Sequence, residues 1–439
     1  MELQLKNIGM IKEANVKIDG LTVIAGENST GKSTIGKLLF SLIKSTSRYN
    51  EDLEESKEDK ILHLVQQNYF ALRKEIDFSV DKKYQQLFSS YSFSRDIRKY
   101  GEDAINGRIN FIKDTSLSNI EKNLLEMKKI LLKDSDIEEA QKSGFKKALI
   151  SEFNGRISTK NNLNELTSIK INEGKNKILD IELLNDKIEK FNFIDELSFS
   201  DATFIESPIV LQLSEIIKNS KTYFEESDPD NRMQRMMRPN IPLHIKDLDN
   251  KLKIATYEDN LFDIEDLFGV DSNIENILSN LSSIMDGRFE YVGKEKDFKY
   301  ISQDGNHFNS LNTATGIKAF GIIQMLIKSE IINQNSLLIL DEPEVHLHPK
   351  WQLKYAELIV ELVNNNVNVL VTSHSPYMIE ALQRYSGLSK INSDFYLAED
   401  SYIKKINNSN SETLSEIFEK LSEPFDIFEE MESERFQNG

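Results

Sequence analysis

The chain of 439 residues is long enough for two or three domains, or for one domain with a large insertion. It has no cysteine, which excludes disulfides and thiolate metal sites, and 54 basic against 72 acidic residues give a formal net charge of −18. This charge excludes binding of nucleic acid or an anionic membrane over the whole surface, but it allows a local basic groove. The N-terminus has no signal-peptide core and no run approaches about 18 apolar residues, so we expect a cytoplasmic protein without a membrane partner.

Short strands open the chain. The segment "LQLKNIGMIKEANVKI" alternates apolar and polar residues in two runs, which predicts two half-buried strands. Leu21–Ala25 is an apolar run between Gly20 and Gly26, as expected of a buried strand. Behind it, Ile35 to Ile43 show helical spacing of apolar residues.

Between this strand and helix lies "GENSTGKST", in which Gly26, Gly31, Lys32 and Ser33 have the spacing of a phosphate-binding loop. Successive backbone N–H groups of such a loop converge on phosphate oxygens, and the helix behind it adds its positive N-terminal end. Lys32 would neutralise the β and γ phosphates, and Ser33 would ligate magnesium. We expect the nucleotide-binding residues to be Gly26, Asn28, Ser29, Thr30, Gly31, Lys32, Ser33 and Thr34.

The sequence then becomes polar with helical periodicity, and residues 48–167 are predicted to form a helical insertion. All eight prolines lie at or after Pro208, so this half of the chain lacks the strongest helix breaker. Ile120, Leu124, Met127 and Leu131 form one stripe, but about two heptads are too few for a long coiled-coil arm.

Two strand pairs are predicted farther on, in "SIKINEGKNKILDIELL" with a turn at Gly174 and in "FEYVGKEKDFKYIS". The connector "RPNIPLH", from Arg238 to His244, has the Arg–His spacing of a ribonuclease motif normally found on a helix. Pro239 and Pro242 disfavour a helix there, so we expect a structural lid or connector.

The segment "NSLLILDEPEVHLHP" predicts a buried strand, Leu337–Leu340, that ends in Asp341 and Glu342. Burying two adjacent carboxylates is costly unless cations or donors meet them. With a nucleotide bound, Asp341 would hold magnesium, and Glu342 would orient and deprotonate the attacking water.

A second apolar strand, in "VNVLVTSHSP", ends near His374, whose imidazole could reach the γ-phosphate. Helix-separated parallel strands with chemistry at their carboxyl ends are the usual α/β arrangement for a ligand site. We therefore expect Glu342, His374 and Lys32 to be the catalytic residues.

The sequence resembles the ABC-type ATPase heads of the SMC, RecF and OLD (overcoming lysogenisation defect) group in four ordered motifs: "GENSTGKST", "LNTATGIK", "LILDEPEVHLHP" and "VTSHSP". The resemblance is closest to phage-defence ATPases of OLD-like, Septu or PARIS type without a Toprim domain. The resemblance implies an α/β fold, an ABC-type P-loop ATPase head with a mixed sheet and a large helical insertion, and hydrolysis of ATP with magnesium. Residues 1–47 would be its N-terminal part, 48–167 the insertion, and 168–310 the rest of the first lobe with a hairpin, a glutamine-loop-like segment and a helical lid. The signature, Walker B, D-loop and His switch would occupy residues 311–408, and an acidic helical tail 409–439.

Such heads close on ATP with a second copy, so the resemblance implies a homodimer or higher homo-oligomer. The signature segment that acts in trans is best matched by Thr315, Gly316 and Lys318, at a helix N-terminus suited to a γ-phosphate. The usual paired glycines are missing, since Thr315 precedes Gly316 and Ile317 follows it.

Glu206 or Ser207, in "ATFIESP", falls at the position of the glutamine loop, where no glutamine is present. Ser29 stands where many relatives have glycine. "PEVHLHP" would be the loop that crosses the dimer interface, and this assignment is favoured over transition-metal binding by His346 and His348.

Three functions remain open. In the first, the protein is an ATP-driven sensor and scaffold of a bacterial anti-phage system that controls a partner nuclease or toxin. This hypothesis is favoured because OLD proteins have a Toprim nuclease after the ATPase, whereas the short segment after His374 has no acidic metal cluster. The alternative is a DNA-repair or chromosome-maintenance ATPase of SMC/RecF type that clamps DNA directly. The third, a transporter subunit, would need a membrane partner.

Two further features leave alternatives open. "NRMQRMMR" and "KSGFKK" could contact nucleic acid within an assembly, although charge runs are usually solvated faces. In the acidic tail, Leu414, Ile417, Phe418 and Leu421 have helical spacing, which fits a helix packed on the head or a docking surface for a partner.

Overall fold

The computed structural model describes residues 1–47, 49–76, 78, 80–113, 115, 117–132, 137–153, 157–158, 165–220, 222, 240–257 and 272–437. The chain forms two compact units. The first, called the head below, comprises Met1–Ser47, Phe145–Phe224 and Met233–Gly439, and the second unit comprises Arg48–Gly144 and Glu225–Arg232.

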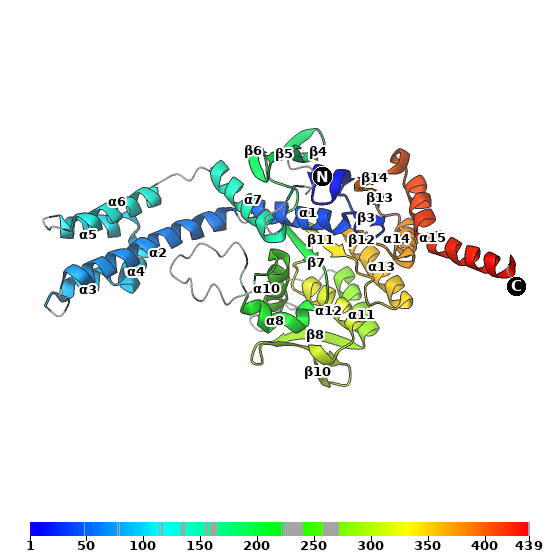
Figure 1. The fold of residues 1–439 in the computed structure, drawn as a ribbon. Helices are drawn as coiled ribbons and strands as arrows, with labels where there is room; N and C mark the ends of the chain where they lie inside the picture. The colour runs from blue at the N-terminus through cyan, green and yellow to red at the C-terminus, as the bar shows by residue number, and fades with distance from the viewer. Residues whose placement is uncertain are drawn as a thin grey trace. The chain divides into compact units, whose positions relative to one another are not determined.

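A mixed sheet forms the centre of the head (Figure 1). Within the described ranges it has eleven strands in the order β6–β5–β4–β1–β2–β14–β13–β3–β12–β11–β7. These strands are β1 (Glu2–Ile8), β2 (Ile11–Lys17), β3 (Leu21–Gly26), β4 (Thr167–Glu173), β5 (Asn176–Leu184), β6 (Lys187–Phe193), β7 (Asp201–Ile205), β11 (Ser336–Asp341), β12 (Asn368–Ser373), β13 (Ser393–Glu399) and β14 (Tyr402–Lys404). A smaller antiparallel sheet contains β8 (Gly287–Val292), β9 (Asp297–Ser302) and β10 (His307–Asn309).

The strands that position the site are parallel. Strands β13, β3, β12, β11 and β7 run in one direction, and β3, β12 and β11 are the middle members of this group. The carboxyl ends of β3, β11 and β12 therefore meet at one edge of the sheet, at Gly26, Asp341 and Ser373.

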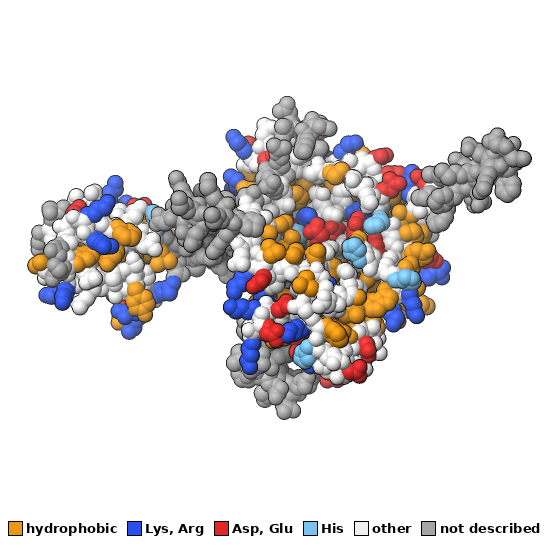
Figure 2. Space-filling view, turned by 60° about the horizontal axis from the view of Figure 1, so that its bottom comes forward, with side chains coloured by type: hydrophobic (Ala, Val, Ile, Leu, Met, Phe, Trp, Pro, Cys, Tyr) orange, Lys and Arg blue, Asp and Glu red, His pale blue; other side chains and the backbone are white. Residues whose placement is uncertain are grey.

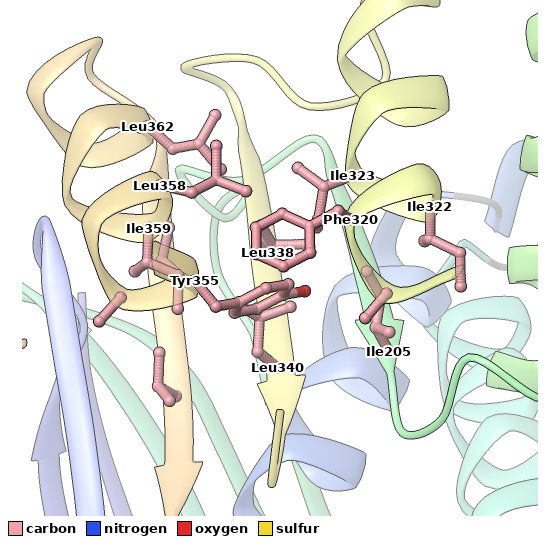
Figure 3. Close-up of a cluster of buried hydrophobic side chains, with 14 of the residues drawn as sticks. Ile205, Phe320, Ile322, Ile323, Leu338, Leu340, Tyr355, Leu358, Ile359 and Leu362 are labelled. Carbon is pink, nitrogen blue, oxygen red and sulfur yellow. The ribbon is translucent and has the colours of Figure 1, made fainter. Parts of the chain in front are cut away.

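Both faces of these strands are covered, as a parallel sheet requires. Leu338 and Leu340 of β11 pack in one hydrophobic cluster against α12 (Thr315–Lys328) and α13 (Pro349–Asn364), as Figure 3 shows. Leu337 and Ile339 alternate to the other face and join the cluster formed with α1 (Lys32–Ser47). The continuous apolar run predicted for this strand thus reflects burial on two sides.

The head contains further helices. They are α8 (Val210–Lys218), α10 (Leu243–Tyr257), α11 (Ser272–Met285), α14 (Pro376–Ser389) and α15 (Asn410–Gln437), with 3-10 turns η5 (Ser310–Asn312) and η6 (Ile406–Asn408). Leu414 and Ile417 of α15 are buried in the head core, so the first turns of the acidic tail pack on the head.

The second unit is helical in its described part. Its helices are α2 (Tyr49–Glu75), α3 (Lys82–Phe88), α4 (Ser90–Tyr100), α5 (Glu102–Ile112) and α6 (Ser118–Leu132), and α7 (Ile137–Phe153) leads back into the head. Ile120, Leu124 and Met127 of the predicted stripe are buried in this unit's own core.

The predicted fold class, α/β with a mixed sheet and a P-loop head, is confirmed. The predicted hairpins are β4–β5 and β8–β9. No helix in the described part of the chain is long and apolar enough to cross a membrane. "NRMQRMMR" and Arg238 and Pro239 of "RPNIPLH" lie outside the described residues, while His244 lies in the first turn of α10.

Candidate nucleotide-hydrolysis site

The phosphate-binding loop connects β3 to α1, as the sequence predicts. Gly31 has a φ of +94°, and a Cβ there would lie 2.7 Å from Ile11 Cγ1, so this position requires glycine. Ser29 also has a positive φ, of 65°, a conformation that glycine adopts more readily. Asn28 and Ser29 are exposed and Thr30, Ser33 and Thr34 half-buried, while Gly26 and Lys32 are buried.

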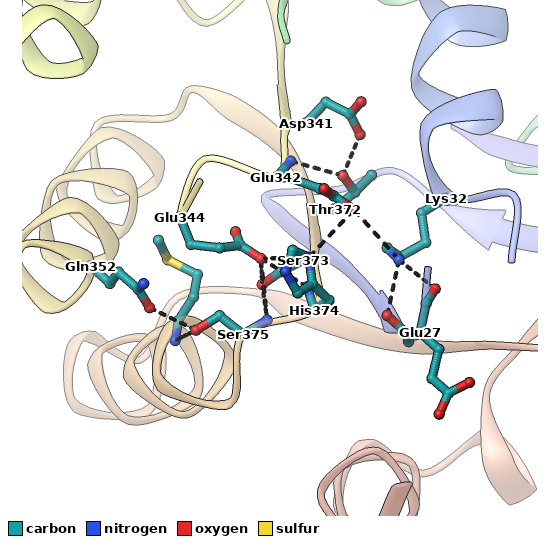
Figure 4. Close-up of polar contacts among 12 residues, drawn as sticks. Glu27, Lys32, Asp341, Glu342, Glu344, Gln352, Thr372, Ser373, His374 and Ser375 are labelled. Carbon is teal, nitrogen blue, oxygen red and sulfur yellow. Dashed lines mark hydrogen bonds and ion pairs between the residues drawn. The ribbon is translucent and has the colours of Figure 1, made fainter. Parts of the chain in front are cut away.

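Lys32 lies inside this loop, with a side chain only 3% exposed (Figure 4). Its ammonium donates to the carbonyl oxygens of Gly26 at 2.9 Å and Glu27 at 2.7 Å, and lies 3.7 Å from Glu342 Oε1. Burial lowers the pKa of Lys32, while the charge of Glu342, followed by that of Asp341, opposes the shift. A phosphate would add a stronger anionic partner to a cation already held in the loop.

Asp341 ends β11 and is 6% exposed. The Thr372 hydroxyl donates to its Oδ1 at 2.5 Å. Burial raises the pKa of Asp341, hydrogen bonds from Thr372 and Ser33 lower it, and the negative charges of Glu206 and Glu342 raise it further. A cation beside Asp341 would reverse this effect.

The oxygen donors of Asp341 and Ser33 fit Mg²⁺, which takes one or two protein oxygens plus water and phosphate oxygens. Among the described residues, no group of three His, Cys, Asp or Glu side chains is arranged to hold a metal ion by itself. Asp341 and Ser33 could supply the one or two protein oxygens that such an ion needs.

Glu342 follows the strand in a left-handed conformation with φ of 49°, so the chain leaves the sheet at this residue. Its N–H donates to the backbone oxygen and the hydroxyl of Thr372, both at 3.1 Å. Its carboxylate is 28% exposed, and Oε1 lies 3.4 Å from His374 Nδ1. Glu342 is thus anchored through its backbone, while its carboxylate faces the region between Lys32 and His374.

Glu344 is a residue of the site that the sequence analysis did not single out. It is buried, and its Oε1 accepts three hydrogen bonds, from Ser373 Oγ at 2.8 Å, His374 N at 2.8 Å and Ser375 N at 3.2 Å (Figure 4). Ser375 in turn donates to Gln352 Oε1 at 2.6 Å. Glu344 therefore fixes the backbone on which His374 is mounted. The sequence feature that could have indicated Glu344 is its position as the third acidic residue of "DEPEVHLHP".

His374 has one buried polar atom without a hydrogen bond. Its Nδ1 is buried and lies 3.4 Å from both Glu342 Oε1 and Glu344 Oε1. Because neither contact is a hydrogen bond, this nitrogen has unsatisfied hydrogen-bonding capacity between the two carboxylates.

The predicted signature segment begins α12. Thr315 and Gly316 are half-buried, and a Cβ on Gly316 would lie 3.2 Å from Trp351 Cε3, so this turn packs closely on α13. Lys318 is 2% exposed, and burial lowers its pKa. A buried lysine in the first turn of this helix is suited to an anion close by.

The loop after Glu342 is partly exposed. His346 is exposed with φ of 67°, and His348 caps α13, where its Nδ1 accepts from Lys350 N at 3.3 Å. On the face of the head in Figure 2, acidic and histidine side chains gather beside hydrophobic ones.

Glu206, at the predicted glutamine-loop position, follows β7 and is exposed, and Ser207 is half-buried. Strand β7 pairs in parallel with β11, and Ile205 is aligned with Leu340. Glu206 therefore follows its strand at the same edge of the sheet as Asp341.

Comparisons with known proteins identify a family and several relatives. The family model described as "AAA ATPase domain" matches residues 1–379. Endonuclease GajA of Bacillus cereus (strain HuB5-5) is 25% identical over 418 residues, which cover 90% of this chain but 57% of that protein. Septu protein PtuA of Bacillus thuringiensis is 35% identical over 52 residues, which cover 12% of this chain and 13% of that protein. The chain thus spans little more than half of the first relative's length and a small part of the second's.

Solved structures with similarity include an SMC head domain from Thermotoga maritima, with TM-score 0.35, 10% identity, and coverage of 90% of this chain and 93% of that one. An Smc head domain from Pyrococcus furiosus, bound to the C-terminal domain of ScpA, has TM-score 0.37, 12% identity, and coverage of 96% and 99%.

Proposed function

Because this chain belongs to the AAA ATPase domain family and is a P-loop ATPase, we propose that it hydrolyses ATP with magnesium as the sensor and scaffold subunit of a bacterial anti-phage defence system. In this proposal it acts in the cytoplasm, and its nucleotide state controls a nuclease or toxin on another chain. The observation that carries the hydrolytic part is the meeting of Lys32 with Glu342, 3.7 Å apart, at the edge where β3, β11 and β12 end.

Each residue has a role that follows from its surroundings. The backbone N–H groups of Gly26–Thr34 and the N-terminus of α1 bind the triphosphate, and Lys32 neutralises its terminal phosphates. Ser33 and Asp341 hold Mg²⁺, which supplies charge stabilisation of the transferring phosphoryl group. Glu342 accepts the proton of the attacking water, and His374 donates a hydrogen bond to the γ-phosphate.

We further propose that the protein acts as a homodimer or a larger homo-oligomer. In the proposed closed state, Thr315, Gly316 and Lys318 of one copy face the γ-phosphate bound to the other. The exposed Val345 and His346 then lie in the loop that crosses the interface. Thr315 and Gly316 are half-buried and are therefore the accessible part of this segment, whereas Lys318 is buried behind them.

The defence role draws support from the resemblance of the four motifs to OLD-like and Septu-type ATPases and from the similarity to GajA and PtuA. The endonuclease activity in GajA's name is a property of that protein, of which this chain covers 57%. In our proposal the effector is a separate partner. Nucleic acid would then be contacted through the assembly.

Two measurements test this proposal. The purified chain should hydrolyse ATP slowly and only with a divalent cation, and a nuclease or toxin encoded by the neighbouring gene should co-purify with it and respond to Glu342→Gln. The competing function, a SMC/RecF-like ATPase that clamps DNA, predicts DNA binding and DNA-stimulated hydrolysis by this chain alone. Strong DNA stimulation without any effector partner would replace the defence proposal with that one.

A further inference from the structure

A buried histidine joins two carboxylates next to the candidate site. His244 of α10 is 2% exposed, and its Nδ1 lies 2.6 Å from Glu152 Oε2 while its Nε2 lies 3.0 Å from Glu206 Oε2. The backbone N–H of His244 also donates a hydrogen bond to Glu152 Oε1 at 2.8 Å. The side chain of Glu152, near the end of α7, is fully buried, so this carboxylate holds His244 from inside the head.

Two ionic clusters lie on α1, α7, α10 and β7, and His244 belongs to the first of them. Lys37 lies 3.3 Å from Glu206 Oε1. Lys44 lies 2.5 Å from Asp201 and 2.8 Å from Asp247, and Lys251 lies 2.6 Å and 3.1 Å from the same two acids. The first cluster contains Lys37, Glu152, Glu206 and His244, and the second contains Lys44, Asp201, Asp247 and Lys251.

The charges of the first cluster, two carboxylates and Lys37, balance only if His244 is an imidazolium. Both ring nitrogens face carboxylate oxygens, so both must donate, and a neutral imidazole has only one N–H. Burial alone would lower the pKa of His244, but the hydrogen bonds to Glu152 and Glu206 raise it overall. Glu206 is accordingly held as a carboxylate: the hydrogen bond from His244 lowers its pKa to about 2.

Glu206 connects the cluster around His244 with the candidate site. The register that aligns Ile205 with Leu340 brings Glu206 beside Asp341, and the charge of Glu206 contributes to the raised pKa of Asp341. The Glu206 side chain is 43% exposed, unlike Glu152. It is therefore accessible at the same edge of the sheet as the predicted metal-binding residues.

We propose that His244 and Glu152 are positioning residues of the ATPase, which hold the Glu206 carboxylate where it orients the water shell of the magnesium ion bound with ATP. This inference rests on the proposed magnesium–ATP function. Mg²⁺ keeps several of its waters in protein sites, and a second carboxylate near Asp341 can accept hydrogen bonds from them. In this proposal the Glu206 carboxylate accepts hydrogen bonds from the metal-bound waters and does not contact the metal itself.

Two substitutions at one position separate this role from simple packing. A glutamine amide nitrogen can replace Nε2 and keep the bond to Glu206, whereas an asparagine nitrogen replaces Nδ1 and keeps only the bond to Glu152. Both variants lose the imidazolium and the packing of the ring on Phe40 and Phe204. If His244 only stabilises the fold, the two variants should behave alike.

The experiment measures Mn²⁺ binding to the full chain with ADP by electron paramagnetic resonance, and in parallel the Mg²⁺ dependence of hydrolysis. We expect Glu206→Gln and His244→Asn each to weaken Mn²⁺ binding about tenfold, and His244→Gln to weaken it by less than about threefold. Glu215→Gln, an exposed glutamate on α8, is the matched control and should change nothing.

Equal effects of His244→Asn and His244→Gln, or unchanged Mn²⁺ affinity in Glu206→Gln, would overturn the inference. Glu206 is partly exposed, so its variant keeps the test decisive if the His244 variants do not fold. Failure of the wild-type chain to bind Mn²⁺ with ADP would instead refute the proposed function. Mn²⁺ binding that Lys32→Ala abolishes and Glu206→Gln leaves intact would refute this inference alone.

Discussion

Lys32 Nζ and Glu342 Oε1 lie 3.7 Å apart, although the two residues are far apart in the sequence. Lys32 is almost completely buried, and Glu342 is partly exposed. Desolvation would favour a neutral lysine, but the negative charges of Glu342, Asp341 and Glu344 favour the ammonium form. The acids to which we assign metal binding and water activation thus also help to keep Lys32, the proposed phosphate-binding cation, charged.

Replacing Lys32 by alanine should weaken ATP binding itself. The change removes the cation expected at the terminal phosphates and leaves the carbonyl oxygens of Gly26 and Glu27 without its hydrogen bonds. We expect the Kd for a fluorescent ATP analogue to rise at least about tenfold, since charge-assisted hydrogen bonds contribute about 1.5–3 kcal/mol. Lys175→Ala, at an exposed turn, is the control. Unchanged affinity in Lys32→Ala would remove this loop from the binding site.

Glu342→Gln should separate binding from turnover. The amide keeps the size of the side chain but cannot take a proton from water, so we expect kcat to fall by about 10²–10⁴-fold with ATP affinity retained. The variant should also trap the ATP-bound dimer, which size-exclusion chromatography with light scattering would detect. Glu357→Gln, exposed on α13, should behave as wild type. A normal rate in Glu342→Gln would assign the general base elsewhere.

Glu344→Ala should affect hydrolysis through His374. The variant frees three donors that now bond to Glu344 Oε1, so the His374 backbone loses its anchor. We expect kcat to fall about 10–100-fold with a smaller change in ATP affinity, and faster amide hydrogen exchange at His374 and Ser375.

A double-mutant cycle tests whether Glu344 acts through His374. If it does, Glu344→Ala should add little to His374→Ala, because the positioned group is already absent. Fully additive losses would show that Glu344 acts independently of the histidine.

The pH dependence of stability should report on His244. Its pKa is raised in the folded state, so its stabilising contribution is complete below the ordinary histidine pKa of about 6.5 and is lost as pH rises through the folded value. The free energy of unfolding in urea should therefore fall more between pH 6 and pH 9 for wild type than for His244→Gln. The other histidines are common to both proteins and cancel. Parallel pH profiles would show that His244 has no raised pKa.

Sequence patterns predicted the residues that sit directly at strand ends. Lys32, Asp341, Glu342 and His374 each follow or end a short apolar run, and parallel strands bring such positions to one edge of a sheet. Glu344 was quoted within a motif, but its role depends on the approach of the β12 loop, which no local pattern encodes.

The ionic cluster around His244 could not be predicted from the sequence either, because it also depends on contacts between distant segments. Glu152 and His244 are 92 positions apart, and their meeting depends on how α7 and α10 pack on the head. The short strand β7 (Asp201–Ile205) was also missed, because five residues give little periodicity. Without β7, the position of Glu206 beside Asp341 could not be derived.

The packing of α1 on the sheet gives a last test, because this helix begins at the phosphate-binding loop. A Cβ on Gly36 would lie 2.6 Å from Phe204 Cε2 and 3.0 Å from Ile339 Cγ2, so Gly36→Ala must push the helix away from β7 and β11. We expect a loss of about 1–3 kcal/mol in the free energy of unfolding, as for other overpacked cores, together with weaker ATP binding. Gly387→Ala on α14 has no atom within 4 Å of the added Cβ and should be neutral or stabilising by up to about 1 kcal/mol. Denaturant unfolding with and without ATP distinguishes the two variants, and a Gly36→Ala protein as stable as Gly387→Ala would contradict the close helix–sheet contact.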